Sequence, residues 1–212
     1  TVLDKERNNR IFALALPIMG GMVSQNILNI VDTAMVSRLE NSDAALAAVG
    51  LGSFATFMCQ SIVLGLATGV QAAASRRKGE GRLDETALFL NTALLVLIVV
   101  GPLMSFVLFN IAPLFYSLLI DDAKVVELGT PYFETRVLGI MFVGMNFAFR
   151  GYWNAIDMAQ MYMRTIIVMH TANIILNYIL IFGNFGAPAL GVTGAGIASV
   201  TSIMLGTAVY FY

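Results

Sequence analysis

The chain has 212 residues, of which 58% are hydrophobic and only 12% are charged. Soluble domains average about 45–50% apolar and 25% charged residues, so water is not the main solvent of this chain. Since each membrane crossing needs roughly 20 apolar residues, the length allows six transmembrane helices and no soluble domain of useful size. The net charge of -1 hides an uneven distribution and says nothing about nucleic acid, but no basic tract is interleaved with exposed aromatics, so a nucleic-acid partner is not expected.

Six apolar segments follow one another along the chain, and each is long enough to cross a bilayer. The first follows a charged leader that ends at Arg10, and it is too long and too polar to be a signal peptide. The expected helices cover about 11–37, 46–75, 86–115, 131–153, 161–183 and 191–212. The predicted fold class is therefore an all-α membrane protein, with residues 1–212 forming one bundle of six transmembrane helices.

The region between the third and fourth helices is expected to differ from the six spans. Pro102 and Pro113 are expected to bend or end the third helix. In the stretch from Ser117 to Gly129, Asp121 can cap a short helix that Gly129 would close. This pattern predicts an interfacial turn that makes no crossing of its own.

The basic residues are divided unevenly between the two sets of connections, and cytoplasmic loops carry the excess of Lys and Arg. If the N-terminus is cytoplasmic, nine basic residues lie inside and three lie outside. The inner set is Lys5, Arg7, Arg10, Arg76, Arg77, Lys78, Arg82, Arg150 and Arg164, and the outer set is Arg38, Lys124 and Arg136. This predicts a multi-pass protein of the plasma membrane, the inner membrane of a bacterium, with both termini cytoplasmic.

Asp32 is an acid placed inside the first apolar segment. It lies six residues before Arg38, which puts it about 9 Å below the outer end of its helix. An acid at the centre of a transmembrane helix costs roughly 3 kcal/mol. Burial favours the neutral acid, so a proton can be held or released as water access changes. The alternative is a structural acid bonded to a neighbouring helix; the functional interpretation is favoured because intramembrane ionisable residues are so often functional.

Other polar side chains are expected at a similar depth. Asn173 and Asn177 share one face of the fifth helix, and Asn177 lies about 9 Å below its outer end. Ser199 lies about 12 Å into the sixth helix from the same surface. Asp32, Asn173, Asn177 and Ser199 are therefore expected to form one polar nest. The alternative is ordinary hydrogen bonding between helices, which contributes up to about 1–2 kcal/mol per contact.

A second set of residues consists of weaker candidates for a substrate cavity. Gln25 and Asn29 share the face of the acid on the first helix, and Gln60 lies on a mildly polar stripe of the second helix. Met141 and Met145 give the fourth helix a soft, adaptable apolar surface that suits varied lipophilic molecules. Helix packing and lipid contact explain these five residues nearly as well.

Residues for catalysis or metal binding are scarce. The chain has one histidine, His170, and one cysteine, Cys59, and it contains no HExxH motif and no Gly-rich phosphate loop. No Ser/His/Asp set is plausible either. The sequence thus predicts that the protein is not an enzyme and that it holds no metal and no organic cofactor.

Several short motifs resemble, in their order and spacing, the multidrug and toxic compound extrusion (MATE) transporters. They cover essentially the whole chain and lie at residues 16–17, 31–36, 47–52, 67–79, 150–155, 173–183 and 191–199. The resemblance implies one lobe, the amino-terminal one, of a transporter with twelve helices in two six-helix lobes. It also implies export of lipophilic and cationic small molecules in exchange for H+ or Na+.

The same resemblance implies roles for particular residues. Asp32 would be the cation-coupling acid, with Asn173 and Asn177 in its hydrogen-bond network. Some relatives carry an acid where Asn177 stands and a Thr where Ser199 stands. A neutral Asn177 leaves Asp32 as the only carboxylate of the nest, which favours H+ as the coupling ion over Na+. The implied partners are membrane lipid and a second six-helix lobe in the same full-length chain.

Two other functions are weighed against this antiporter. A flippase for lipid-linked oligosaccharides would need a larger and more basic cavity, whereas the candidate intramembrane cations, Arg136 and Arg150, are placed near helix ends. A non-transporting six-helix membrane subunit is the third possibility. A chain that starts without Met and stops inside a helix is more simply a fragment of a longer protein. A cation-coupled multidrug efflux antiporter is therefore the predicted function.

Overall fold

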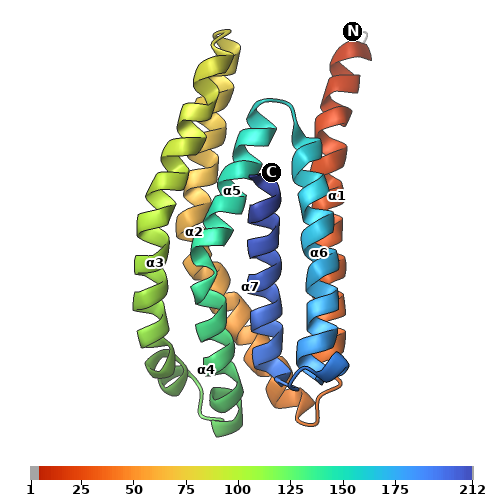
Figure 1. Cartoon of the computed structure of the whole chain (residues 1–212), viewed down its shortest axis with the longest axis vertical. Coiled ribbons are helices and arrows are strands. Elements are labelled where there is room, and N and C mark those ends of the chain that lie inside the picture. Colours follow the sequence, from red (N-terminus) through yellow and green to blue (C-terminus); the bar gives the residue numbers. More distant parts are fainter. Residues whose placement is uncertain (1–4, 212) are drawn as a thin grey trace.

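The structure is a computed structural model that describes residues 5–211, with the side chains of residues 5–10, 13–14 and 17–18 excepted. In this range the chain forms seven α-helices and two short 3-10 helices, most of them running along one common axis (Figure 1). The α-helices are α1 (Lys5–Val36), α2 (Ser42–Gly79), α3 (Thr86–Leu119), α4 (Ala123–Leu138), α5 (Ile140–Ala155), α6 (Ala159–Phe182) and α7 (Gly191–Tyr210). The predicted all-helical fold class is confirmed.

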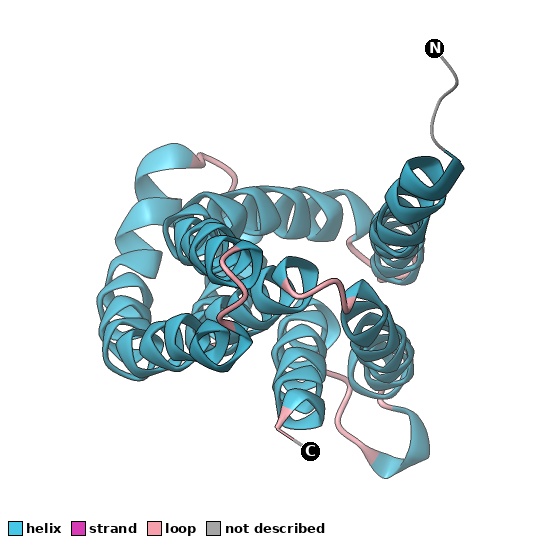
Figure 2. Ribbon diagram, turned by 90° about the horizontal axis from the view of Figure 1, so that it is seen from above, coloured by secondary structure: helices cyan, strands magenta, loops and turns pink. Residues whose placement is uncertain are grey.

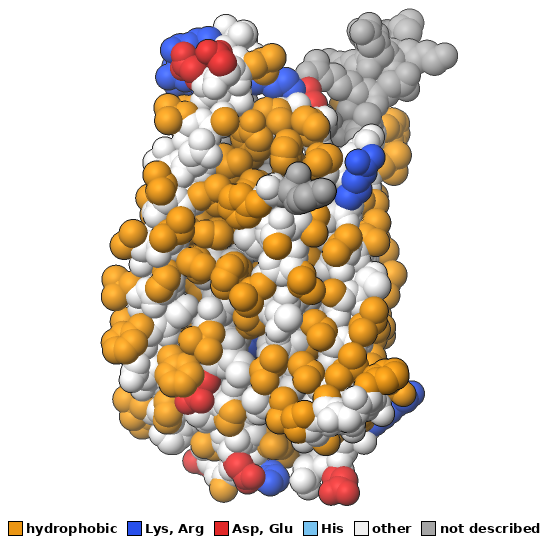
Figure 3. Space-filling view, in the orientation of Figure 1, with side chains coloured by type: hydrophobic (Ala, Val, Ile, Leu, Met, Phe, Trp, Pro, Cys, Tyr) orange, Lys and Arg blue, Asp and Glu red, His pale blue; other side chains and the backbone are white. Residues whose placement is uncertain are grey.

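Four helices of the described part, α2, α3, α6 and α7, are long and apolar enough to cross a membrane by length and composition. Figure 3 shows apolar side chains covering the middle of the molecule, with the charged side chains gathered mostly at its two ends. Large apolar side chains on α3, such as Leu95, Val99 and Phe106, are exposed on this band. A wide exposed apolar band between two charged ends is the surface expected of a protein that faces lipid.

The chain between α3 and α5 differs from the prediction. α3 continues through Pro113 to Leu119, and its last turns bend away from the rest of the helix (Figure 1). The prediction of a short interfacial helix, capped by Asp121 and closed by Gly129, is wrong. Instead α4 begins at Ala123 and runs through Gly129 to Leu138. α5 then continues in the same general direction, so α4 and α5 together take the place of the single helix expected over 131–153.

Capping and packing explain this difference. Asp122, not Asp121, caps α4, because its side chain accepts hydrogen bonds from the backbone N–H groups of Lys124 at 2.8 Å and Val125 at 3.3 Å. Gly129 lies against the ring of Tyr116, and a Cβ there would fall 2.2 Å from a ring carbon. The glycine therefore permits close packing of α3 on α4 and does not end a helix.

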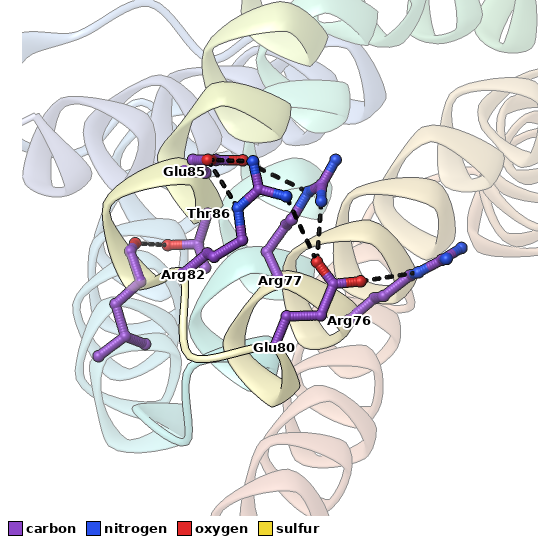
Figure 4. A network of polar contacts seen from close by, with 7 residues as sticks. Arg76, Arg77, Glu80, Arg82, Glu85 and Thr86 are labelled. Atoms are coloured by element: carbon purple, nitrogen blue, oxygen red, sulfur yellow. Dashed lines mark hydrogen bonds and ion pairs between the residues drawn. The ribbon is translucent and has the colours of Figure 1, made fainter.

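One end of the molecule, here called the basic end, contains the α2–α3 hairpin and the connection from α5 to α6 (Figure 1). Glu80 accepts hydrogen bonds from Arg77 at 2.8 Å and from Arg76 at 3.2 Å, and Arg82 pairs with Glu85 across the turn (Figure 4). These hydrogen bonds lower the pKa of Glu80. The network holds the hairpin together where its basic side chains gather.

The opposite end, the acidic end, contains the connections from α1 to α2, from α3 to α4 and from α6 to α7. α1 lies at one edge of the bundle (Figure 2) and packs chiefly on α6. α6 also packs on α7, and α7 packs on α4. These contacts bring the acidic-end halves of α1, α4, α6 and α7 together, and the candidate site lies among them.

Candidate functional site

A layer of apolar side chains closes the bundle near the acidic end. It contains Val36 of α1, Tyr132 of α4, Ile181 of α6 and Ala195 of α7, which are all buried and belong to one hydrophobic cluster. We call these four residues the apolar layer. α1 and α6 run toward the acidic end, whereas α4 and α7 run away from it. One helical turn further into the bundle therefore means four residues back on α1 and α6 and four residues forward on α4 and α7.

Polar and charged residues occupy the next turn on all four helices. They are Asp32 on α1, Arg136 on α4, Asn177 on α6 and Ser199 on α7, each four residues from its neighbour in the apolar layer. Residues four apart on a helix lie on the same face, so these side chains follow directly beneath the apolar ones. We call these four residues the polar layer. It is separated from the acidic end by the apolar layer.

Hydrogen bonds join the predicted nest residues across three helices. Asn177 donates from Nδ2 to Asp32 Oδ1 at 2.7 Å and to Asn173 Oδ1 at 2.9 Å. Asn173 in turn donates from Nδ2 to the hydroxyls of Ser199 and Ser202, both at 3.4 Å. The structure therefore brings Asp32, Asn173, Asn177 and Ser199 into one network, and it adds Ser202, which the sequence had not singled out for this site.

The amide of Asn173 can serve the network in two orientations. In the other orientation its nitrogen donates to Asp32 Oδ1 at 3.1 Å and its oxygen accepts from the backbone N–H of Ser199 at 3.3 Å. That orientation gives the carboxylate a second donor, but it also places the Asn173 nitrogen 2.9 Å from Asn177 Nδ2, so that two donors face each other and the hydrogen bond between the two amides is lost. Both orientations keep Asp32 joined to α6 and α6 joined to α7.

One atom of the network is without a partner. Asn177 is fully buried, and its Oδ1 accepts no hydrogen bond from any described residue. An unsatisfied buried acceptor costs about 1–3 kcal/mol, so it favours any state that supplies a donor. A carboxylate is an acceptor only, whereas a protonated Asp32 carries an O–H that can donate. The network therefore holds an unused acceptor next to the one group whose protonation creates a donor.

The structure separates Gln25 and Asn29 from the nest. Both side chains are exposed and bond to each other, Gln25 Nε2 donating to Asn29 Oδ1 at 3.1 Å. Asn29 lines an open groove of about 630 Å³ on the outer face of α1, together with Asn26, Ile30, Thr33, Ala34 and Ser37. Although Asp32 lies only three residues further along, its side chain turns toward α6, because that helix supplies its donor.

The other weak candidates are not brought together either. Met145 is buried in the larger apolar core formed by α2, α3, α4 and α5, and Met141 packs against Gly101 of α3. Gln60 is half-buried on α2. His170 lies within 2.6 Å of the Ser24 hydroxyl, which explains it as a satisfied packing residue between α1 and α6. In this arrangement the two methionines face helix neighbours and do not line a cavity.

Arg136 is the member of the polar layer that sequence reasoning misplaced. The placement of Arg136 near the outer end of a helix starting at 131 is wrong, because α4 starts at Ala123. Arg136 therefore lies about 20 Å along α4, among buried neighbours. The residue that misled the sequence analysis is Gly129, which receives the Tyr116 ring and does not end the helix. One guanidinium at this depth does not make the large basic cavity that a flippase requires.

Fold and site together define a class: a multi-pass helical membrane protein with a half-buried acid, Asp32, in a hydrogen-bonded network between helices. No group of three His, Cys, Asp or Glu side chains among the described residues is placed to hold a metal ion. The sequence profile of the MatE family matches residues 17–179. The chain belongs to the MatE family, the MATE transporters.

Comparisons with individual proteins support this family membership. The chain is 27% identical over 196 residues to the probable multidrug resistance protein NorM of Pasteurella multocida, covering 92% of this chain and 41% of that protein. It is 28% identical over 189 residues to the multidrug resistance protein PmpM of Pseudomonas aeruginosa, covering 89% and 39%. A multidrug resistance MATE transporter solved in an outward-facing conformation superposes with a TM-score of 0.84 at 25% identity, covering 94% and 43%. The chain thus spans about two fifths of the length of these relatives.

The network predicts a specific loss of stability when Asn177 is changed. Asn177→Leu removes the donor to Asp32 and to Asn173 and leaves a half-buried carboxylate with fewer partners, so we expect the free energy of unfolding to fall by about 2–3 kcal/mol. The measurement is the thermal unfolding midpoint of the purified full-length transporter. Asn29→Leu is the matched control, because its amide is exposed and bonds only to Gln25. A loss for Asn177→Leu no larger than that of the control would contradict the network.

Proposed function

We propose that this chain is the amino-terminal lobe of a cation-coupled multidrug exporter and that Asp32 is its coupling acid. The single observation that supports the role of Asp32 is its hydrogen bond from Asn177, whose other amide atom is a buried acceptor without a partner. Membership of the MatE family supports the transport function. The relatives are named for multidrug resistance, and lipophilic, cationic molecules are the proposed substrates.

Protonation of Asp32 would change the hydrogen bonds between α1 and α6. The charged acid accepts from Asn177 Nδ2, as seen here. The neutral acid can instead donate to Asn177 Oδ1 once that amide turns, and Nδ2 then gives up its bonds to Asp32 and Asn173. The proton thus replaces one set of contacts by another and shifts the balance between two arrangements of the helices.

α1 is the element most able to respond to this change. It lies at the edge of the bundle (Figure 2) and packs chiefly on α6, so few contacts hold it in place. Val36, one turn from Asp32, belongs to the apolar layer that separates the nest from the acidic end. A shift or bend of α1 would therefore open the nest to water on that side and give protons and substrates access in turn.

The coupling ion we propose is H+, with Na+ as the alternative. Asp32 is the only carboxylate among the residues of the polar layer, and its neighbours Asn173, Asn177 and Ser199 are neutral. A proton needs one basic oxygen and a hydrogen-bond acceptor, both of which the network supplies. A sodium ion needs several oxygen ligands pointing at one spot, and Asn177 presents nitrogen, not oxygen, to Asp32.

A second lobe is proposed to follow in the full-length chain, because the relatives extend to more than twice the matched length. The basic end is proposed to face the cytoplasm. Arg76, Arg77, Lys78 and Arg82 lie there on the α2–α3 hairpin. The acidic end carries Asp121 and Asp122 in the connection from α3 to α4, and Glu127 near the start of α4. The positive-inside rule supports this orientation, which places the nest near the outer surface of the inner membrane.

Asp32→Asn in the full-length transporter tests the coupling role. We expect ion-driven efflux of a cationic dye to be lost, because the amide can no longer take up or release a proton. The measurement is dye transport in everted membrane vesicles under an imposed proton gradient, repeated under a sodium gradient. Asp121→Asn, an exposed acid at the acidic end, is the matched control and should transport normally. Undiminished proton-driven export by Asp32→Asn would contradict the assignment of Asp32 as the coupling acid.

The proposed orientation is testable with two single cysteines in a Cys59→Ser background. Glu40→Cys lies between α1 and α2 at the acidic end, and Asp84→Cys lies in the α2–α3 hairpin at the basic end; both positions are exposed. A membrane-impermeant maleimide added to intact spheroplasts should label the cysteine at position 40 and spare the one at position 84. The reverse pattern would mean that the lobe is inserted the other way round.

A further inference from the structure

Arg136 is a permanent positive charge inside the bundle. It belongs to the polar layer with Asp32, Asn177 and Ser199, one turn beyond Tyr132 on α4. A guanidinium does not give up its proton under any cellular condition, so the charge persists in every state of the transporter. Charged residues within membrane segments face the bundle interior or a water-filled cavity and are functional candidates by default. The coupling mechanism proposed above leaves this charge without a role.

The contacts of Arg136 leave its hydrogen-bonding edge free. Its guanidinium carbon lies 5.9 Å from the centre of the Tyr132 ring, which places a π face against the cation. Its Nε is buried and donates to no described residue, and no described acid lies within ion-pair distance of it. Asp32 acts on it through space and not through a hydrogen bond.

This arrangement makes the electrostatic situation of Arg136 depend on Asp32. While Asp32 is charged, its carboxylate offsets the guanidinium across the polar layer, as opposite charges do in a medium of low dielectric constant. Once Asp32 is protonated, Arg136 is a half-buried cation with no ion-pair partner among the described residues. The helices packed against α4 are chiefly α2, α3 and α7. Near the Arg136–Tyr132 pair they place Ser53, Tyr116 and Ser199, none of which is a carboxylate that could replace Asp32.

We infer that Arg136 binds the carboxylate of an amphiphilic anion or zwitterion and that it does so most tightly when Asp32 is neutral. This inference rests on the proposed titration of Asp32. The free Nε and a neighbouring Nη form the edge of the guanidinium that takes a carboxylate through two parallel hydrogen bonds. Organic cations and protons then compete at Asp32, whereas carboxylates and protons bind together. The lobe would thus hold an anion most tightly in its protonated state.

The experiment uses two xanthene dyes of opposite charge on the purified full-length transporter. Fluorescein, a carboxylate, and rhodamine 6G, a cation, are titrated by fluorescence polarisation. We expect Asp32→Asn to tighten fluorescein binding by about tenfold, within the usual range of coupling between sites. Arg136→Gln should weaken fluorescein binding by at least as much, while rhodamine 6G still binds at least as tightly as to wild type, which also shows that the variant is folded.

Two further variants test whether the guanidinium group itself, and this arginine in particular, binds fluorescein. Arg136→Lys retains the charge without the flat two-donor edge, so an intermediate affinity for fluorescein is expected. Arg150→Gln is the matched control, because Arg150 lies near the basic end and stacks on Phe147. Equal fluorescein affinity of wild type and Arg136→Gln would overturn this inference and leave the coupling role of Asp32 intact. Undiminished proton-driven export by Asp32→Asn would overturn the proposed function while leaving the Arg136 anion site to be judged by its own titration.

Discussion

The hydrogen bond from Asn177 to Asp32 is the contact on which the rest of the site depends. It holds the half-buried acid of a peripheral helix, and it joins α1 to α6, which in turn bonds α7 through Asn173. A carboxylate placed inside an apolar bundle is tolerable only if donors surround it. Asn177 supplies a donor to this carboxylate, and Asn173 and Ser199 continue the same network into α7.

The apolar layer gives this contact its functional meaning. Val36, Tyr132, Ile181 and Ala195 stand between the polar layer and the acidic end, so access to Asp32 from that end requires a movement of this layer. Among the described α-helices, the one that carries Asp32 makes the fewest helix contacts (Figure 2). The proposed coupling would link a proton on Asp32 to the position of this helix.

Helix depth and spacing were enough to predict the nest, but not the residues whose position depends on packing. Counting 1.5 Å per residue placed Asp32, Asn177 and Ser199 near one level, because transmembrane helices are nearly parallel and start at common surfaces. Gln25 and Asn29 share a face with Asp32 on paper, yet α1 is turned so that only the acid reaches α6. The sequence of one helix does not say how that helix is rotated against its neighbour.

The start and length of α4 also could not be predicted from the sequence pattern alone. Asp121 and Asp122 are equivalent caps by residue type, and the backbone at Asp122 decided between them. The continuation of α4 from this cap through Gly129 to Leu138 places Arg136 in the polar layer and not at a helix end. Gly129 was equally ambiguous, since a glycine that ends a helix and one that receives the Tyr116 ring look alike in a sequence.

The most direct test of the account is a measurement of proton release when a cationic drug binds. Rhodamine 6G is added to the purified full-length transporter in a weakly buffered solution that contains a pH-sensitive dye. If Asp32 carries the exchanged proton, wild type releases protons as the drug binds and Asp32→Asn releases none while still binding the drug. Equal proton release by both proteins would contradict the central claim that Asp32 couples drug to proton.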